Sequence, residues 1–355
     1  MNKNRFVYLL LIVLAIIAII LIWNNRYLST LEGESADFSV SDTSSVTRVF
    51  LADMDSNQVL LERKGQHWQL NGVYKAQQNK VDQLLETMYR LRVRNPVPLA
   101  SHDQVVARMA SLGIKVEVYQ MVHRINLFDR IKLFPREKLT KVFYVGDVTR
   151  DNLGTYMLKE KAEQAFVMYI PGFRGFVMTR YTPIEDDWRD HIIFNEKLAD
   201  IKSVKLEFNE QPYMSFIIEN IGKHSYKLTR TADQFEIAAY DTLRVLNFLT
   251  SFNDVRFEAV LTNTLPTARQ DFIINSPFLH RFTLINHNGD TNQLTTYNKK
   301  LQVEHLGITE DQAEIDNDRM YGLLNNGEDL VLLQYFTFDK LLRPVIFYEE
   351  GGPAM

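Results

Sequence analysis

Acidic side chains gather in two stretches of the sequence, and carboxylates are the groups that metal binding or general acid–base catalysis would use. The first cluster lies between Pro183 and Phe194 and comprises Glu185, Asp186, Asp187, Asp190 and His191. Adjacent carboxylates on a loop do not define a coordination geometry, and no second ligand motif accompanies them. We therefore interpret residues 183–200 as an acidic linker, with a metal site or an acid–base pair as the alternative.

The second acidic stretch runs from Leu301 to Asp318 and contains no Lys or Arg. Its carboxylates are those of Glu304, Glu310, Asp311, Glu314, Asp316 and Asp318. Calcium favours clustered carboxylates, but the stretch lacks the DxDxDG spacing and the glycine of a calcium loop. We expect a solvated acidic loop or helix here, and no bound metal.

Motifs of known catalytic chemistry are absent from the sequence. It contains no GxSxG, HExxH, GxxxxGK[ST] or GxGxxG pattern, and its eight His residues are scattered. Because there is no Cys, disulfides, thiolate zinc sites and Cys nucleophiles are excluded together. The sequence thus predicts no catalytic residue and no cofactor and favours a non-enzymatic role, with a site assembled from distant residues as the alternative.

A segment from Arg124 to Lys141 combines basic and apolar side chains between two expected strands. Such a segment can bind an anionic membrane surface or an acidic partner. The candidate contact residues are Arg124, Leu127, Phe128, Arg130, Ile131, Lys132, Phe134, Arg136 and Lys138. Two alternatives stay open: a long hairpin packed on its own sheet with solvated cations, or a pairing of this segment with the acidic stretch 301–318.

An uninterrupted apolar run extends from Phe6 to Trp23 and contains no charge, Pro or Gly. As a helix it would span about 27 Å, close to the hydrocarbon thickness of a bilayer. It is longer than the apolar core of a signal peptide, and no small-x-small cleavage site follows it. We expect residues 1–27 to form a cytoplasmic stub and a retained transmembrane anchor of a bacterial inner-membrane protein. Lys3 and Arg5 favour a cytoplasmic N-terminus and an extracytoplasmic body.

The charge of the chain bears on its partners. The formal net charge is −4, from 40 basic and 44 acidic residues. Residues 1–27 hold three of the basic residues and no acid, which leaves 37 basic and 44 acidic residues and a net charge of −7 for the remainder. A mildly acidic body argues against nucleic acid as a partner. We expect a lipid bilayer and a membrane protein as partners, and the oligomeric state stays open.

We expect residues 28–45 to form a polar tether. Two copies of one order of secondary-structure elements follow, at 46–182 and 201–350. Each copy begins with short strand-like runs, continues with an amphipathic helix and returns to strands. An offset of 158 residues matches Val46 with Val204 and Trp68 with Tyr226, and an offset of 165 matches Tyr156 with Tyr321. Between the two helices, the expected matches are Leu84, Leu85, Met88 and Leu91 with Val245, Leu246, Leu249 and Phe252. The predicted fold class is α+β: an N-terminal transmembrane helix followed by two similar β-meander-plus-helix copies.

The runs FSVSDTSSVTRVFL, WQLN and VDQLLETM, with WRDHIIF opening a second copy, resemble a bacterial family. It is the domain-of-unknown-function family of single-pass envelope proteins associated with gliding-motility-type ABC exporter components, and the resemblance covers most of residues 36–348. It implies a membrane-anchored extracytoplasmic domain and carries over no catalytic residue. We expect a scaffold or an accessory subunit of an envelope complex, with a cell-wall or glycan hydrolase or a ligand-binding receptor as the alternative.

Overall fold

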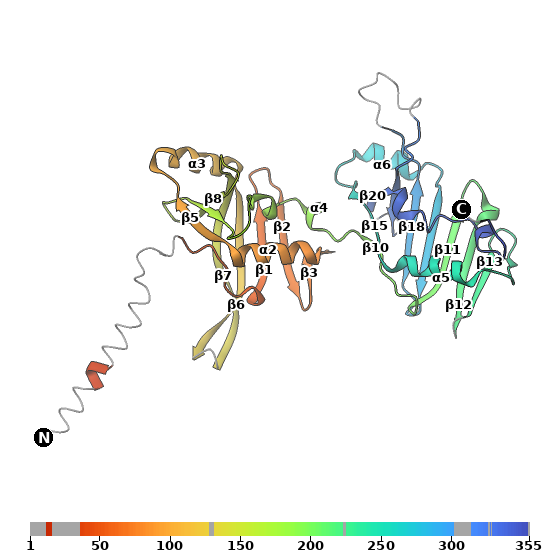
Figure 1. Ribbon diagram of the computed structural model, residues 1–355, viewed down its shortest axis with the longest axis horizontal. Helices are drawn as coiled ribbons and strands as arrows, with labels where there is room; N and C mark the ends of the chain where they lie inside the picture. The colour runs from red at the N-terminus through yellow and green to blue at the C-terminus, as the bar shows by residue number, and fades with distance from the viewer. Residues whose placement is uncertain are drawn as a thin grey trace. The chain divides into compact units, whose positions relative to one another are not determined.

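The computed structural model describes residues 12–15, 36–127, 131–222, 225–301, 314–325, 327 and 329–353 (Figure 1). The chain divides into two compact units, Met1–Asp190 and His191–Met355. Each unit is built on a nine-stranded sheet in which all neighbouring strands are antiparallel.

The first unit carries its nine strands in the order β4-β3-β2-β1-β6-β7-β8-β9-β5. In chain order they are β1 (Val46–Ala52), β2 (Gln58–Lys64), β3 (His67–Leu70), β4 (Tyr74–Lys75), β5 (Arg92–Pro96), β6 (Ile114–Leu127), β7 (Ile131–Val148), β8 (Thr155–Lys159) and β9 (Phe166–Tyr169). The helical segments are η2 (Thr43–Ser45), α2 (Gln78–Arg90), α3 (Leu99–Leu112), η3 (Met178–Tyr181) and α4 (Glu185–Trp188).

The second unit carries its large sheet in the order β14-β13-β12-β11-β17-β18-β19-β20-β16 and a small sheet of β10 and β15. The strands are β10 (Ile192–Phe194), β11 (Ile201–Phe208), β12 (Phe216–Gly222), β13 (Ser225–Arg230), β14 (Phe235–Glu236), β15 (Val255–Arg256), β16 (Ala259–Val260), β17 (His280–Asn286), β18 (Thr291–Tyr297), β19 (Arg319–Leu324) and β20 (Asp329–Gln334). The helical segments are η4 (Pro212–Met214), α5 (Thr242–Thr250), η5 (Ser251–Asn253), α6 (Thr267–Ile274), α7 (Tyr335–Phe338) and η7 (Val345–Phe347).

The two large sheets share one strand order, and the agreement extends to the register. The β1–β6 pairing shifts between Val46 and Arg48, and the β11–β17 pairing shifts at the corresponding point between Ile201 and Ser203. On the other side of the sheet, Tyr156 in β8 pairs with Val167, as Tyr321 in β19 pairs with Leu332. Each unit thus builds the same sheet from a different sequence.

In each unit, helices cover the sheet on both faces. Because α2 turns one apolar stripe inward, Val81, Leu84 and Met88 pack in the main core of the first unit with Trp68. On the opposite face, the buried Met109 of α3 packs in a smaller core at the β8–β9 end. The second unit repeats this arrangement with α5 in its main core and the buried Ile273 of α6 in a smaller one; these helices are labelled in Figure 1.

The ends of α2 and α5 are held by the same contacts. The backbone N–H of Gln77, the residue before α2, donates to the carbonyl of Trp188 at 2.7 Å, and Asp241 before α5 donates to Tyr348 at 2.8 Å. At the other end of the helices, Met88 accepts from the backbone of Val40 at 3.0 Å. Phe252 likewise accepts from Glu196 at 3.0 Å. These bonds use backbone groups that helix ends leave unsatisfied, and they join segments from both ends of each unit; we call them the helix clasp.

The predicted α+β class is wrong. The chain is mostly β-sheet, with three antiparallel sheets, and α2, the helix with the widest buried stripe, has only 13 residues. Within the described residues, no helix is both long enough and apolar enough to cross a membrane. The expected transmembrane helix Phe6–Trp23 lies outside the described residues except for residues 12–15, which are helical.

The expected linker 183–200 is divided between the two units. Trp188 is 2% exposed and packs in the core of the first unit, and Phe194 is fully buried in the core of the second.

The expected match between the two helices needs a correction. Gln77 and Asp241 occupy equivalent positions before the two helices, which aligns Val81, rather than Leu84, with Val245.

The burial of His280 makes the stability of the second unit depend on pH. Burial lowers the pKa of His280 from 6.5 to about 4, and its Nδ1 lies 3.0 Å from the Thr296 hydroxyl. As the pH falls from 6.5 to 4, the unfolded chain binds a proton that the folded chain does not bind. The free energy of unfolding should therefore decrease, by at most about 1.4 kcal/mol per pH unit from this group. In chemical denaturation, His280→Gln should lose less stability than the wild type over this range, whereas the exposed-site control His287→Asn should follow the wild type.

Candidate functional site

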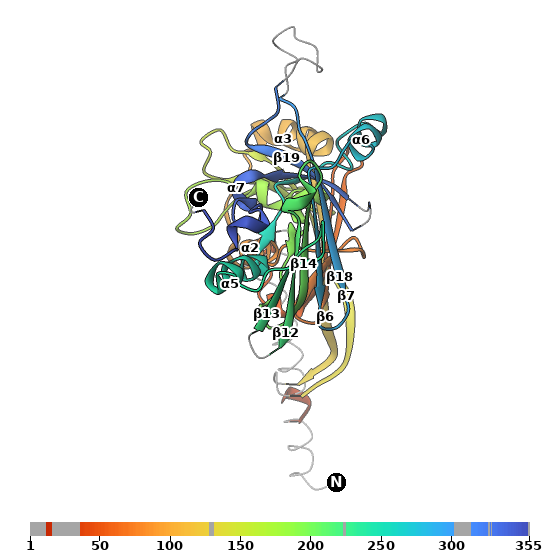
Figure 2. The same ribbon diagram turned by 90° about the vertical axis from the view of Figure 1, so that its right-hand side faces the viewer.

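The long hairpin of β6 and β7 extends beyond the sheet that carries it. Strand β1 pairs with β6 only as far as Gln120, whereas β6 and β7 continue to pair as far as Leu127 and Ile131. Figure 2 shows the hairpin reaching past the neighbouring strands. In the second unit, the corresponding strands do not pass the first residue of β11: β17 ends at Asn286, opposite Ile201, and β18 begins at Thr291. The projecting hairpin therefore belongs to the first unit alone.

The described part of the projecting hairpin carries different side chains on its two faces. Residues directly opposite each other in a β-ladder share a face. Tyr119 pairs with Leu139 and Met121 with Glu137 on one face. On the other face the pairs are Gln120 with Lys138 and Val122 with Arg136. The hairpin thus presents an apolar-rich face and a basic face.

Large apolar side chains on the hairpin are open to solvent. Phe134 is 65% exposed and Leu133 is 45% exposed, while Met121 and Leu139 are each more than a third exposed. Phe134 also has a φ of +57°, a backbone conformation that non-glycine residues adopt rarely. Isolated exposed apolar residues are ordinary, but several on one projecting element form a surface suited to binding.

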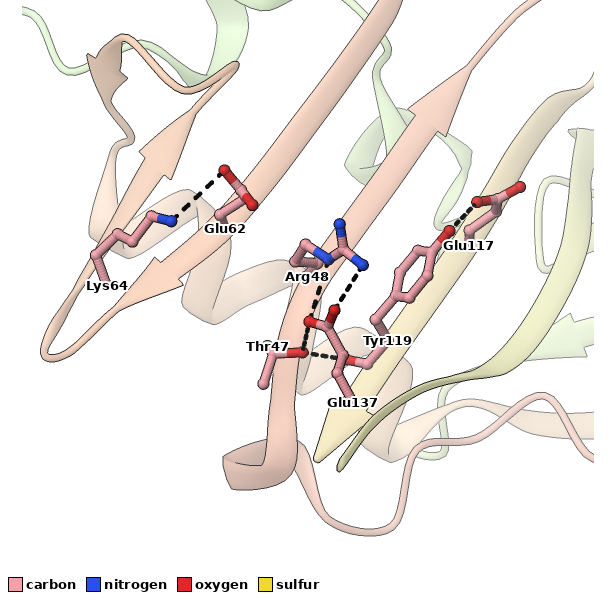
Figure 3. A network of polar contacts seen from close by, with 7 residues as sticks. All are labelled: Thr47, Arg48, Glu62, Lys64, Glu117, Tyr119 and Glu137. Atoms are coloured by element: carbon pink, nitrogen blue, oxygen red, sulfur yellow. Dashed lines mark hydrogen bonds and ion pairs between the residues drawn. The ribbon is translucent and has the colours of Figure 1, made fainter. Parts of the chain in front are cut away.

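A polar network fixes the base of the hairpin to strand β1 (Figure 3). Glu137 accepts two hydrogen bonds from the Arg48 guanidinium, at 3.1 and 2.6 Å, and a third from the Thr47 hydroxyl at 2.5 Å. The Arg48 guanidinium also lies 4.3 Å from the centre of the Tyr119 ring. Because Arg48 binds the carboxylate with two parallel N–H groups, the geometry is the strongest available to an ion pair.

The Tyr119 hydroxyl continues this network by donating to Glu117 at 2.7 Å. Lys115 completes it with an ion pair to Glu117 at 2.6 Å. Burial acts to raise the pKa of Glu117, but hydrogen bonds from Lys115 and Tyr119 outweigh it and hold the pKa below its ordinary value. The Glu117 carboxylate in turn raises the pKa of Tyr119, so the phenol stays a hydrogen-bond donor at neutral pH.

Two β-bulges lie at the base of the hairpin. The β1–β6 register shifts at Thr47, and the β6–β7 register shifts at Thr140. The hydroxyl of Thr47 donates to the Tyr119 carbonyl at 3.3 Å, and that of Thr140 donates to the Val118 carbonyl at 3.2 Å. Bulges bend a strand and strengthen its twist. The hairpin therefore leaves the sheet at a bend that is braced by side chains.

Seven of the nine candidate contact residues of the sequence analysis fall on the described part of this hairpin. Phe134, Arg136 and Lys138 are exposed on β7. The structure describes the backbone of four others within the two strands and not their side chains: Arg124, Leu127, Ile131 and Lys132. Phe128 and Arg130 lie outside the described residues. The sequence analysis did not identify the pair of Arg48 and Glu137, which are 89 positions apart. The sequence signal that could have directed attention to it is the longer connection between β6 and β7 in the first copy.

The acidic cluster at 185–191 serves the fold. Glu185 accepts a hydrogen bond from Asn71 at 2.5 Å, Asp187 accepts one from Thr182 at 2.6 Å, and Asp190 pairs with Lys75 at 3.4 Å. The His191 ring belongs to the second unit and stacks on Phe257 with centroids 4.5 Å apart. These contacts point in different directions, so the arrangement does not resemble a metal site or a catalytic pair.

In the second acidic stretch, the structure describes Glu314, Asp316 and Asp318. Asp316 is buried and pairs with Lys299 at 2.6 Å, and it also accepts from the backbone N–H groups of Asp318 and Arg319. Burial acts to raise the pKa of Asp316, but these bonds outweigh it and lower the pKa. Glu304, Glu310 and Asp311 lie outside the described residues. Within the described part of the chain, no three His, Asp or Glu side chains gather as metal ligands would.

Removal of the Glu137 carboxylate should loosen the base of the hairpin. Both partners of the Arg48–Glu137 pair are about one third exposed, so solvent screening limits the loss of stability on Glu137→Ala to about 1 kcal/mol. Amide hydrogen exchange should quicken in β6 and β7 beyond Tyr119 and stay unchanged in β2 and β3. Glu62→Ala is the matched control, because among the described residues Glu62 forms an ion pair only with Lys64, at 3.8 Å on the same strand. Equal exchange in both variants would show that the network does not hold the hairpin.

Comparison with known proteins gives one match. A family model described as a domain of unknown function (DUF4340) matches residues 68–271, a range that begins in β3 and ends in α6. Searches of curated proteins and of solved structures find no significant match. Because the family model covers more than half of the chain, this protein belongs to the DUF4340 family of domains of unknown function.

Proposed function

We propose that this protein is a non-enzymatic, membrane-associated scaffold or accessory subunit of an envelope complex, and that it binds its membrane-protein partner through the β6–β7 hairpin. The observation that carries the proposal is the projection of this hairpin beyond its sheet with exposed apolar and basic side chains. Such a ribbon contributes little to the core of its own unit. A ribbon with an apolar-rich face and a basic face suits a partner that contacts the two faces with apolar and acidic groups.

The braced base of the hairpin supports the same role. A binding element held on a rigid scaffold loses less conformational entropy on association than a loose loop does. The Arg48–Glu137 pair and the two bulges fix the direction in which the hairpin leaves the sheet. The alternative, in which the hairpin packs on its own sheet, would require its apolar side chains to be buried, but Met121, Leu133, Phe134 and Leu139 are exposed.

The sequence at the N-terminus supports a position next to a membrane. The apolar run Phe6–Trp23 favours association with a lipid bilayer, and Lys3 and Arg5 favour an extracytoplasmic location of the two units at the bacterial inner membrane. Residues 28–45 would reach about 25 Å as a flexible chain. The first unit therefore works close to the membrane surface. The resemblance to envelope proteins associated with ABC exporters makes a transporter the favoured partner.

Site-specific cross-linking in native membranes tests the proposal. A photo-reactive amino acid at Met121 or Lys138 should capture an integral membrane protein of a transporter complex. The same group at Gln66, an exposed residue in the turn between β2 and β3, is the matched control and should capture much less. Arg136→Glu combined with Lys138→Glu should reduce the yield from Met121 several-fold, because the acidic surface of the partner would then be repelled.

Two outcomes would contradict the proposal. Equal capture at Met121 and Gln66 would mean that the hairpin is not the contact surface. Capture of lipid alone at Met121, with a photo-reactive lipid as the second probe, would make the hairpin a membrane-binding element instead of a protein-binding one. Circular dichroism checks that the double variant is folded. Both charged positions are exposed, so their exchange should leave the core intact.

A further inference from the structure

A pocket of about 530 Å³ opens on the second unit, between α5 and the C-terminal segment of the helix clasp. Helix α5 contributes Arg244, Phe248 and, just after its last residue, Ser251; the clasp segment contributes Lys340, Arg343 and Tyr348 among others. The volume is in the range of pockets that bind small molecules. The pocket belongs to the second unit, whereas the β6–β7 hairpin belongs to the first.

All ionisable groups with a charge in the pocket lining are cations: Arg244, Lys340 and Arg343. Acidic partners outside the lining balance two of them, since Arg343 pairs with Asp339 at 2.7 Å and Arg244 lies 3.3 Å from Asp241. Lys340 is exposed and forms no ion pair with any residue that the structure describes. The pocket therefore keeps an uncompensated positive charge at its mouth.

Aromatic rings form the apolar part of the same pocket. Phe347 lies under the Arg244 guanidinium, 4.5 Å from it, and Phe248 and Tyr348 are almost fully buried behind the opening. The Tyr348 side chain is fully buried, and its hydroxyl finds no hydrogen-bond partner among the described residues. Burial raises the pKa of Tyr348 and keeps the phenol uncharged, so the ring adds apolar surface to the pocket lining.

The first unit closes the corresponding position with its own side chains. The helix alignment matches Thr87 with Ser251, and Arg180 precedes Trp188 by as many residues as Lys340 precedes Tyr348. In the first unit, Arg180 donates to the Thr87 hydroxyl at 2.8 Å and lies 4.8 Å from the Phe173 ring. In the second unit, the Ser251 hydroxyl donates to the Asn247 carbonyl at 2.7 Å, as the Thr87 hydroxyl donates to the Gln83 carbonyl at 2.7 Å, but among the described residues it accepts no hydrogen bond from Lys340. The exchange of Arg for Lys leaves this position open.

We propose that this pocket binds a small amphiphilic anion: its carboxylate or phosphate group contacts Lys340 and Arg343, and its apolar group covers Phe248 and Phe347. The occupant is either a soluble organic anion or the head group of an anionic lipid, which share this chemistry. Arg244 is held by the Phe347 carbonyl at 2.7 Å, as Lys80 is held by the Asp187 carbonyl in the first unit. We therefore assign Arg244 to the clasp and the selective contact to Lys340.

The test is calorimetric titration of the full chain, in nanodiscs of zwitterionic lipid, with 2-naphthoate as the probe. Lys340→Glu should weaken binding at least about tenfold, because it reverses the charge that has no partner. Ser251→Thr combined with Lys340→Arg should weaken it by a similar factor while the charge is kept, because it rebuilds the contact that closes the first unit. Lys202→Glu, at an exposed position of the same unit, is the charge-matched control and should bind as the wild type does.

Two further measurements complete the test. The uncharged 2-naphthamide should bind at least about tenfold more weakly than 2-naphthoate. Phosphatidylglycerol in the nanodiscs should compete with 2-naphthoate if the occupant is a lipid head group. It should have no effect if the occupant is a soluble anion, and both results agree with an anion site. Wild-type affinity in both Lys340→Glu and the double variant, or equal binding of the amide, would overturn the proposal.

Discussion

The helix clasp is the constraint on which each unit depends. Helices α2 and α5 lie across one face of their sheets, and a helix of this length gains its stability from packing more than from its own propensity. Two backbone hydrogen bonds fix each helix: one from Gln77 or Asp241 to the segment after the last strand, and one from the segment before the first strand of the large sheet. Because these segments come from opposite ends of each unit, the clasp closes the chain around its core. Trp188 and Tyr348 supply the carbonyls that accept the bonds from Gln77 and Asp241, and both side chains are buried in the core that the clasp closes.

Because the clasp fixes the core of each unit, the connections between its elements can differ from those of the other unit. Both proposed binding surfaces lie where the two units differ. The first unit extends β6 and β7 beyond β1, whereas the second unit ends the corresponding strands with a turn. The second unit in turn leaves open a position that Arg180 and Thr87 occupy in the first. The shared sheet supplies stability, and the departures from it supply surfaces for partners.

Much of the local structure could be predicted from the sequence, and the errors have physical causes. The match of Trp68 with Tyr226 places two buried residues at equivalent points of β3 and β13, because a large buried ring stands out in a short strand. The helix match failed by about one turn, since an amphipathic pattern with a period of 3.6 residues agrees with itself when it is moved by three or four positions. The match of Val46 with Val204 failed because a bulge follows Val46 and Ile201, which breaks the alternation that a strand otherwise shows. The fold class failed because several short strands pair with distant segments, and sequence periodicity does not reveal pairing.

The candidate sites were harder to foresee because they depend on contacts between residues far apart in the chain. Arg180 and Thr87 are 93 positions apart, and only the fold brings the guanidinium to the hydroxyl. The replacement of Arg by Lys at position 340 keeps the charge, so a comparison of the two copies by charge alone finds no change. A guanidinium is a planar fork that can donate to a fixed acceptor while it stacks on a ring, whereas an ammonium on a flexible chain does neither as well. A substitution that is conservative in charge can therefore open a pocket, and the exposed ammonium group of Lys340 gives that pocket a group that binds anions.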